Sequence, residues 1–155
     1  MLKSILVLIG VLLFAGCGKN RASFIKDSLS DFNTTTTLKR FSKALEAKNY
    51  HLTSTIDQEK IAKSLKEYLR PTITFELNNP KISTKLISCN PSMAIELPIR
   101  FAIYRELNGK VHLIYTNPEY WSLKHNIKDK ECIDLIMLLA RDFDIATDSI
   151  KRVKK

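Results

Sequence analysis

Two runs of alternating residues, joined by an Asn-Gly pair, constrain the fold more than any other part of the sequence. Along residues 97–104, and again along 111–115, a large apolar side chain stands at every second position. Such alternation predicts strands that bury one face. Asn108 and Gly109 tolerate the positive φ angles that a tight turn needs. The two runs are therefore expected to pair as an antiparallel β-hairpin.

The rest of the chain adds helices and further strands. Apolar residues at helical spacing predict a helix over residues 35–48, a second one after the capping residue Asp57, and a long one over 128–150. Strands are expected around 24–32 and over 50–56 and 70–77. This order favours the α+β class, a mainly antiparallel sheet with helices packed on one face. Three apolar residues form one narrow stripe on the second helix: Ile61, Leu65 and Leu69.

The N-terminus has the pattern of an exported lipoprotein. Lys3 precedes an apolar run of about ten residues, which is too short to span a membrane and suits a secretory signal. Ala15-Gly16-Cys17 follows, and it resembles the lipobox at which bacterial lipoproteins are cleaved and lipidated. We therefore expect a lipid on Cys17, and anchoring to a membrane of the cell envelope with the domain facing the periplasm. Gly18 favours sorting to the outer membrane. An ordinary secreted protein with a stray cysteine is the alternative.

These patterns divide the chain into four segments. We expect a signal peptide over residues 1–16, a lipid anchor and tether over 17–32, one α+β domain over 33–150 and a basic tail over 151–155. The formal net charge of +9 would suit a nucleic-acid-binding protein, but the basic residues are spread along the chain and an exported protein does not meet nucleic acid. A solvated surface near anionic lipid headgroups is the simpler interpretation.

Residues that would carry a cofactor or a metal are not grouped in the sequence. His51, His112 and His125 are scattered, and no cysteine has metal-ligand spacing to another ligand. We therefore expect neither a metal nor a cofactor. No set of nucleophile, base and orienting residue is recognisable either, and His125 is expected to be an ordinary surface histidine.

Three stretches resemble a known family. They are "DQEKIA" at 57–62, "RPTITFELNNPKISTKLISCNPSMAIELPIRFAIY" at 70–104 and "GKVHLIYTNPEYWSLKH" at 109–125. Their order and spacing are similar to those of the domain of unknown function 302 family, over about residues 33–148. Asn78 and Ser83 depart from the pattern, since glycine is common at both positions in the family. The resemblance implies a β-α-β(4)-α sandwich like that of TATA-box-binding proteins. It implies no activity and no nucleic-acid binding, because one fold hosts unrelated functions.

The strand pattern places four polar residues on the face of the sheet away from the predicted core. They are Glu76, Arg100, Tyr104 and His112. Together they are a candidate face for a ligand or a partner, in which Arg100 would pair with a carboxylate or a phosphate. A solvated face with cross-strand charge pairs, or the surface of a homodimer, is the alternative.

The segment "NNPKISTKLISCNP" at residues 78–91 predicts a short helix between two strands. Pro80 suits a first helical turn, and Asn90 before Pro91 ends the helix. A connector is the simpler interpretation of this segment. The alternative is an anion-binding turn formed by Asn79, Lys81 and Thr84 at the N-terminus of the helix.

Cys89 and Cys132 remain once Cys17 is lipidated. An oxidising compartment favours a disulfide between them. Against a disulfide, Cys132 adjoins the apolar stripe of the long helix, where a cysteine often behaves as a small hydrophobe. Of the two states we expect two free thiols.

Two classes of function follow from these observations. The first is a non-enzymatic, membrane-anchored envelope lipoprotein that binds a ligand or a partner protein. The second is a thiol- or histidine-dependent enzyme of the cell envelope, for which a reactive Cys89 would be the best evidence.

Overall fold

The computed structural model describes residues 24–153. The expected signal peptide and the lipidation site at Cys17 lie outside the described residues. Five strands form one antiparallel sheet in the order β1-β5-β4-β3-β2. The strands are β1 (Ile25–Ser30), β2 (His51–Asp57), β3 (Thr72–Asn78), β4 (Ile99–Arg105) and β5 (Val111–Thr116).

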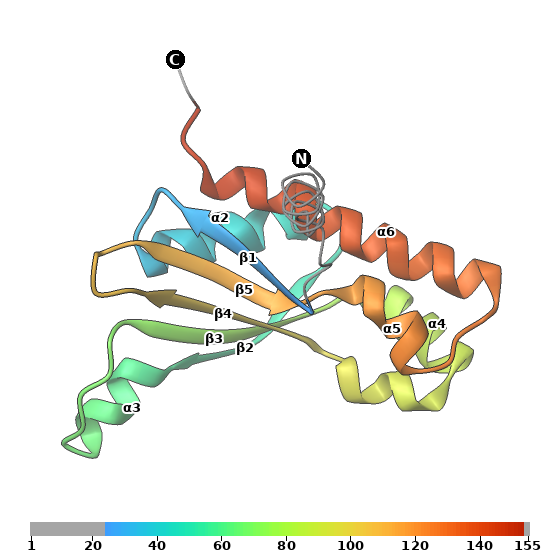
Figure 1. Ribbon diagram of the computed structural model, residues 1–155, viewed down its shortest axis with the longest axis horizontal. Coiled ribbons are helices and arrows are strands. Elements are labelled where there is room, and N and C mark those ends of the chain that lie inside the picture. The colour runs from blue at the N-terminus through green and yellow to red at the C-terminus, as the bar shows by residue number, and fades with distance from the viewer. Residues whose placement is uncertain (1–23, 154–155) are drawn as a thin grey trace, which may run out of the picture.

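Helices surround this sheet on one face and at both ends (Figure 1). They are α2 (Thr34–Glu46), α3 (Gln58–Ser64), α4 (Pro80–Cys89), α5 (Trp121–Lys124) and α6 (Lys130–Thr147), with 3₁₀ turns η1 (Pro91–Glu96), η2 (Pro118–Tyr120) and η3 (Asp148–Ile150). The two longest, α2 and α6, cover one face of the sheet. The α+β class and the antiparallel sheet are thereby confirmed.

The predicted hairpin forms around the Asn-Gly pair. Glu106 and Lys110 close the turn through a backbone hydrogen bond of 2.8 Å, which leaves three residues in the loop. Gly109 has a φ of +84°, a left-handed conformation that glycine adopts without a steric cost. The Asn108 side chain accepts a hydrogen bond from the Lys110 amide at 2.9 Å. The local sequence thus determines both the position and the shape of this turn.

Aromatic side chains fill the space between the sheet and its two covering helices. Phe101 on β4 lies at the centre, with its ring centroid 5.1 Å from Phe41 of α2 and 5.1 Å from Phe143 of α6. Phe75 of β3 and Tyr115 of β5 flank it at 5.2 and 5.4 Å. All five side chains are buried. Buried aromatic rings contribute both apolar area and favourable edge contacts, so this cluster stabilises the fold.

Three details of the structure add to the expected division of the chain. The domain begins at β1 rather than at residue 33, because residues 25–30 pair with β5 over six positions. The basic tail is held at its start, since Lys151 donates to the Leu29 carbonyl and the Arg152 amide donates to Asp31 at 2.8 Å. Helix α3 ends at Ser64, and Ala62 is its buried residue. The three residues of the apolar stripe that follows Asp57 are exposed: Ile61, Leu65 and Leu69.

Candidate functional site

The face of the sheet opposite α2 and α6, called here the open face, carries two cross-strand pairs. Glu76 on β3 lies opposite Arg100 on β4, as period-2 alternation predicts. Arg100 donates to Glu76 Oε1 from Nη2 at 2.7 Å and from Nε at 3.1 Å. The Arg100 side chain is 74% exposed. An ion pair in this position contributes little to stability, which leaves the guanidinium available for another contact.

Tyr104 and His112 form the second pair, further along the open face. Their rings stack with centroids 4.9 Å apart. His112 Nδ1 lies 2.8 Å from Asp27 of β1, and Nε2 lies 3.4 Å from Glu106 without hydrogen-bond geometry. Burial, and then the negative charges of Asp27 and Glu106, raise the pKa of Tyr104. Neighbours on the sheet surface, rather than a helix, bury His112. The predicted four residues therefore lie on the open face as two separate pairs.

A hollow of about 430 Å³ adjoins the first pair, where the chain passes from η1 into β4. Glu76, Arg100 and Glu96 line it with charge. Its apolar lining comes from both the sheet and the entering chain: Ile25, Ile95, Leu97, Pro98, Ala102 and Ile114. Tyr104 and His112 do not line it. An apolar floor with one exposed guanidinium at its side is the usual composition of a small-ligand site.

In the predicted anion turn, the polar groups of Asn79 already have hydrogen-bond partners within the protein. Asn79 is buried, and its Oδ1 accepts from the Ile82 amide at 3.3 Å as the N-cap of α4. Its Nδ2 donates to the Lys48 carbonyl at 3.1 Å. Lys81 and Thr84 are exposed. Lys81 borders a separate hollow of about 530 Å³ between α4 and α6. In this structure Asn79 therefore ends a strand and starts a helix, as a connector residue does.

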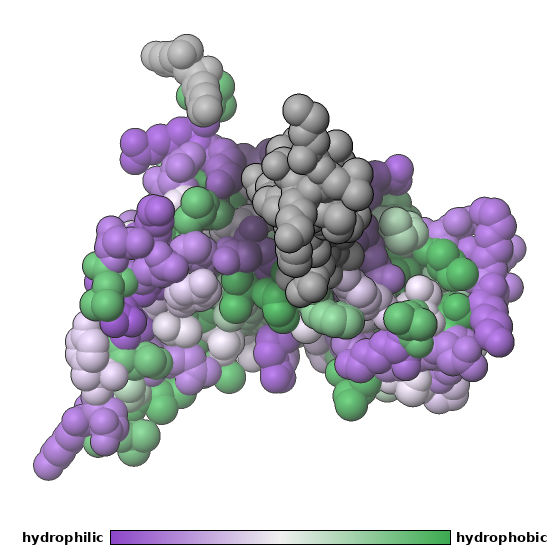
Figure 2. Space-filling view, viewed as in Figure 1, coloured by the Kyte–Doolittle hydropathy of each residue, from purple (hydrophilic) through white to green (hydrophobic). Residues whose placement is uncertain are grey.

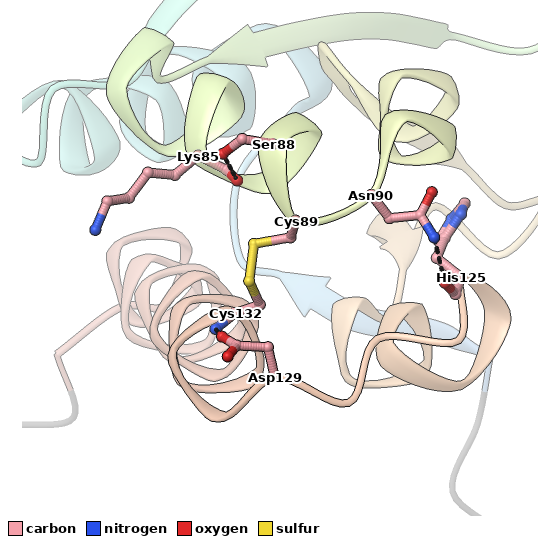
Figure 3. The surroundings of a disulfide bond; sticks show 7 residues. All are labelled: Lys85, Ser88, Cys89, Asn90, His125, Asp129 and Cys132. Atoms are coloured by element: carbon pink, nitrogen blue, oxygen red, sulfur yellow. Dashed lines mark hydrogen bonds between the residues drawn. A yellow bond between two sulfur atoms is a disulfide. The ribbon is translucent and has the colours of Figure 1, made fainter.

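Cys89 and Cys132 are joined as a disulfide between α4 and the first turn of α6 (Figure 3). Their sulfurs are 2.00 Å apart and their Cα atoms 6.1 Å apart. The structure thus differs from the expected pair of free thiols. The reason is packing: Cys132 is half-buried and faces α4, and its amide is held by Asp129 Oδ1 at 3.0 Å.

A third group of polar residues escaped the sequence analysis. His125 is buried rather than on the surface, with 5% of its side chain exposed. Its Nδ1 lies 2.7 Å from Ser92 Oγ, and its Nε2 lies 2.9 Å from Glu96 Oε1. The three residues thus form a continuous chain of hydrogen bonds between η1 and the end of α5. His125 lies 29 residues after Glu96 and 33 after Ser92, and the three belong to no recognised motif, so no signal in the sequence reveals the group.

Burial and neighbouring charges have opposite effects on the pKa of Glu96. Its side chain is 8% exposed and also pairs with Lys124 Nζ at 2.6 Å. Burial alone would raise the pKa of Glu96, but hydrogen bonds and charges from Lys124 and His125 outweigh burial, and the pKa lies below its ordinary value. Asn90 Nδ2 donates to the His125 carbonyl at 2.8 Å and so fixes the backbone on which the imidazole stands (Figure 3). The carboxylate is therefore charged and held at neutral pH.

Two other kinds of feature are absent from residues 24–153. In that range no group of three or more His, Cys, Asp or Glu side chains is placed to hold a metal ion. Within the same part of the chain, no helix has the length and apolar character that crossing a membrane requires. The open face with its hollow, and the group around His125, are thus the two arrangements of polar side chains that invite a functional interpretation.

Comparison with known proteins agrees with the fold. The family model "Domain of unknown function DUF302" matches residues 26–144. A solved structure described as an uncharacterized conserved protein DUF302 from Bacillus stearothermophilus superimposes with a TM-score of 0.74. It is 15% identical, and the match covers 83% of this chain and 99% of that one, so this likeness concerns the fold alone. A search of curated proteins found no match. Because the family model spans most of the chain, the protein belongs to the DUF302 family.

Proposed function

We propose that the protein is a non-enzymatic binding protein of the cell envelope, which holds a ligand or a partner on the open face of its sheet. The observation that carries this proposal is the hollow of about 430 Å³ beside Arg100. It combines an apolar lining with a charged group that the fold does not bury. A sheet face that is only in contact with solvent would need neither an apolar hollow nor an exposed charged group beside it.

The lining indicates the chemistry of the occupant. A guanidinium has five N–H donors, and Arg100 uses two of them on a single oxygen of Glu76. The remaining donors suit a carboxylate, a phosphate or a carbonyl oxygen. Ile95 and Ile114 border the same hollow, so an apolar body can lie beside that group. The expected ligand or partner segment therefore joins an apolar part to an anionic or hydrogen-bond-accepting part.

Site-specific photo-crosslinking tests this proposal in cells. A benzophenone amino acid at Ala102, which lines the hollow, should give an adduct with the occupant. The same amino acid at Lys39, which is exposed on α2, is the matched control. An adduct of twice the protomer mass would identify a second copy as the partner. Equal adduct formation at both positions, or none at either, would refute a binding role for the open face.

The membrane part of the proposal rests on Cys17, which follows Ala15 and Gly16 in the sequence. A diacylglyceryl group there would keep the domain at a membrane surface facing the periplasm, because each buried methylene contributes about 0.8 kcal/mol. Gly18 supports the outer membrane as the destination. Changing Cys17 to Ala should move the protein from the membrane fraction to the soluble fraction. Retention of this variant in the membrane fraction would overturn the anchor.

A thiol-dependent enzyme would need a free cysteine as its nucleophile, and the candidate, Cys89, is joined to Cys132 in a disulfide. A disulfide sulfur is not a nucleophile. The histidine-dependent alternative has a specific observation in its favour, namely the hydrogen bonds of His125 to Ser92 and Glu96. These contacts lead to a separate inference that does not depend on the open face.

A further inference from the structure

We propose that Ser92 is an activated nucleophile, with His125 as its base and Glu96 as the carboxylate that positions the imidazole. Ser92 Oγ, the imidazole and Glu96 Oε1 form one hydrogen-bonded chain with links of 2.7 and 2.9 Å. A serine hydroxyl, an imidazole and a carboxylate in this order are the arrangement by which proteins activate serine, whatever their fold. The substrate class is an activated acyl or phosphonyl ester.

The hydrogen-bond partners determine where the imidazole proton lies. Glu96 is a charged acceptor, so the imidazole nitrogen beside it, Nε2, carries the hydrogen. The other nitrogen, Nδ1, then has a lone pair directed at Ser92 Oγ. The Ser92 hydroxyl has two acceptors within reach, His125 Nδ1 at 2.7 Å and Asn90 Oδ1 at 2.9 Å. Nδ1 receives the proton when the hydroxyl hydrogen points toward the imidazole. Neutral histidine with this tautomer is the form that acts as a general base.

The side chains of the base and the carboxylate are buried, whereas the nucleophile is exposed, as such a site requires. His125 and Glu96 are both buried, and Lys124 and Asn90 hold the carboxylate and the histidine backbone from the other side. Ser92 stands at the second position of η1 and is exposed, so an incoming reagent can reach its hydroxyl. A base held rigidly behind an accessible hydroxyl is pre-organised for proton transfer.

The chemical step follows from these positions. Ser92 Oγ attacks the carbonyl carbon or phosphorus of the ester, its proton passes to His125 Nδ1, and the leaving group departs with the bonding electron pair. The Ser92 amide cannot help to stabilise the developing oxyanion, because it already donates to Asn90 Oδ1 at 2.9 Å. The loss of one such donor lowers the rate by a factor of about 10² to 10³. We therefore infer a single covalent modification of Ser92 rather than rapid turnover.

A fluorophosphonate probe tests this directly on the full-length protein in mild detergent. Ser92 Oγ should displace fluoride from phosphorus, and intact mass with peptide mapping should find one adduct at Ser92. Replacing His125 by Gln should slow labelling about 100-fold, the usual contribution of a general base. Glu96→Gln should give an intermediate rate. Ser88→Ala is the matched control, since Ser88 is exposed nearby and donates only to the Lys85 carbonyl.

Two further readouts separate activation from folding. The H125Q variant should keep the circular dichroism spectrum of the wild type, so that its slower labelling reports loss of the base rather than unfolding. Added imidazole should restore part of the rate to His125→Ala. Labelling of Ser92 no faster than that of Ser88, or a rate that H125Q leaves unchanged in a folded protein, would overturn the proposal.

Discussion

The two ends of the sheet are built in different ways. At one end, called the capped end, α4, η1, α5 and the first turn of α6 pack together and are linked by the disulfide and by the hydrogen bonds of His125 (Figures 1 and 3). At the other, the α3 end, α3 and the β4–β5 turn project into solvent. Large side chains are exposed there: Leu65 at 68%, Tyr68 at 85% and Leu107 at 86%. Figure 2 shows hydrophobic atoms, in green, on the surface at this end of the molecule.

The difference shows what short elements need in order to hold a position. Isolated helices of this length are unstable in water, and α5 has four residues and η1 has six. At the capped end, covalent and polar links between the elements supply the missing stability. α3 has seven residues and depends on its Asp57 cap and on one buried alanine. Residues that could carry chemistry are therefore better placed at the capped end, where side chains are fixed.

Removing the disulfide should produce the largest loss at the capped end. The bond closes a loop with a sequence separation of 43 residues. The loop-entropy model assigns about 4 kcal/mol of unfolding free energy to a loop of that size. A double variant, Cys89→Ser with Cys132→Ser, should lose this amount in urea unfolding. Reductant should lower the wild-type midpoint and leave the variant unchanged. An unchanged wild-type midpoint would mean that packing, not the bond, holds the capped end.

Truncating His125 should have the second largest effect. His125→Ala removes one hydrogen bond from the buried Glu96 carboxylate, which keeps Lys124 as its other partner, and one from the exposed Ser92. Losing a partner of a buried charged group costs about 1 to 3 kcal/mol. Urea unfolding should show a loss in this range. His51→Ala is the control, since His51 is exposed. An equal, small effect in both variants would contradict the view that polar links hold the capped end.

Acid should act on the capped end through Glu96. Because its pKa in the folded state is lowered, its pairing stabilises the protein fully above the ordinary glutamate value of about 4.3. This stabilisation is lost as the pH falls through the lowered value. Thermal melts from pH 7 to 3 should therefore show a shallower acid decline for Glu96→Gln than for wild type. Parallel curves would show that the carboxylate is not coupled to folding.

The open face should tolerate substitution with a small effect on stability. Arg100→Ala removes an exposed ion pair to Glu76, and such pairs contribute less than about 1 kcal/mol. Urea unfolding of the variant should stay within that limit, while crosslinking from Ala102 should fall. Phe101→Ala, on the opposite face of the same strand, should cost about 3 to 5 kcal/mol. A comparable loss in the two variants would contradict the division of β4 into a core face and an open face.

The α3 end should show the smallest effect. Leu65→Ser and Tyr68→Ser alter exposed side chains, so unfolding free energy should change by less than about 0.5 kcal/mol. Solubility should rise, because exposed apolar surface favours association. Light scattering at increasing protein concentration would measure this change. A loss of stability similar to that of His125→Ala would show that Leu65 and Tyr68 make stabilising contacts despite their large exposed fractions.

The sequence predicted those features that depend on local periodicity. Alternation assigned Phe101 to the core and Arg100 to the open face, because strand side chains alternate between faces whatever the strand pairs with. The same kind of pattern could not place Leu65, since helical spacing shows that a stripe exists but not that a partner covers it. The site at His125 could not be predicted, because it joins Ser92 and Glu96 of η1 to His125 at the end of α5, and the proximity of these two segments depends on the whole fold.

The irregularity in β2 bears on how readily another strand can add to this edge of the sheet. β2 is an outer strand of the sheet, and its register with β3 shifts between Leu52 and Ser54. An uninterrupted outer strand presents a row of backbone groups to which a neighbouring molecule can add its own strand. The extra residue, Thr53, bends that row and increases its twist, so a second sheet cannot follow it. A small local defect thereby opposes the growth of a continuous sheet across this edge.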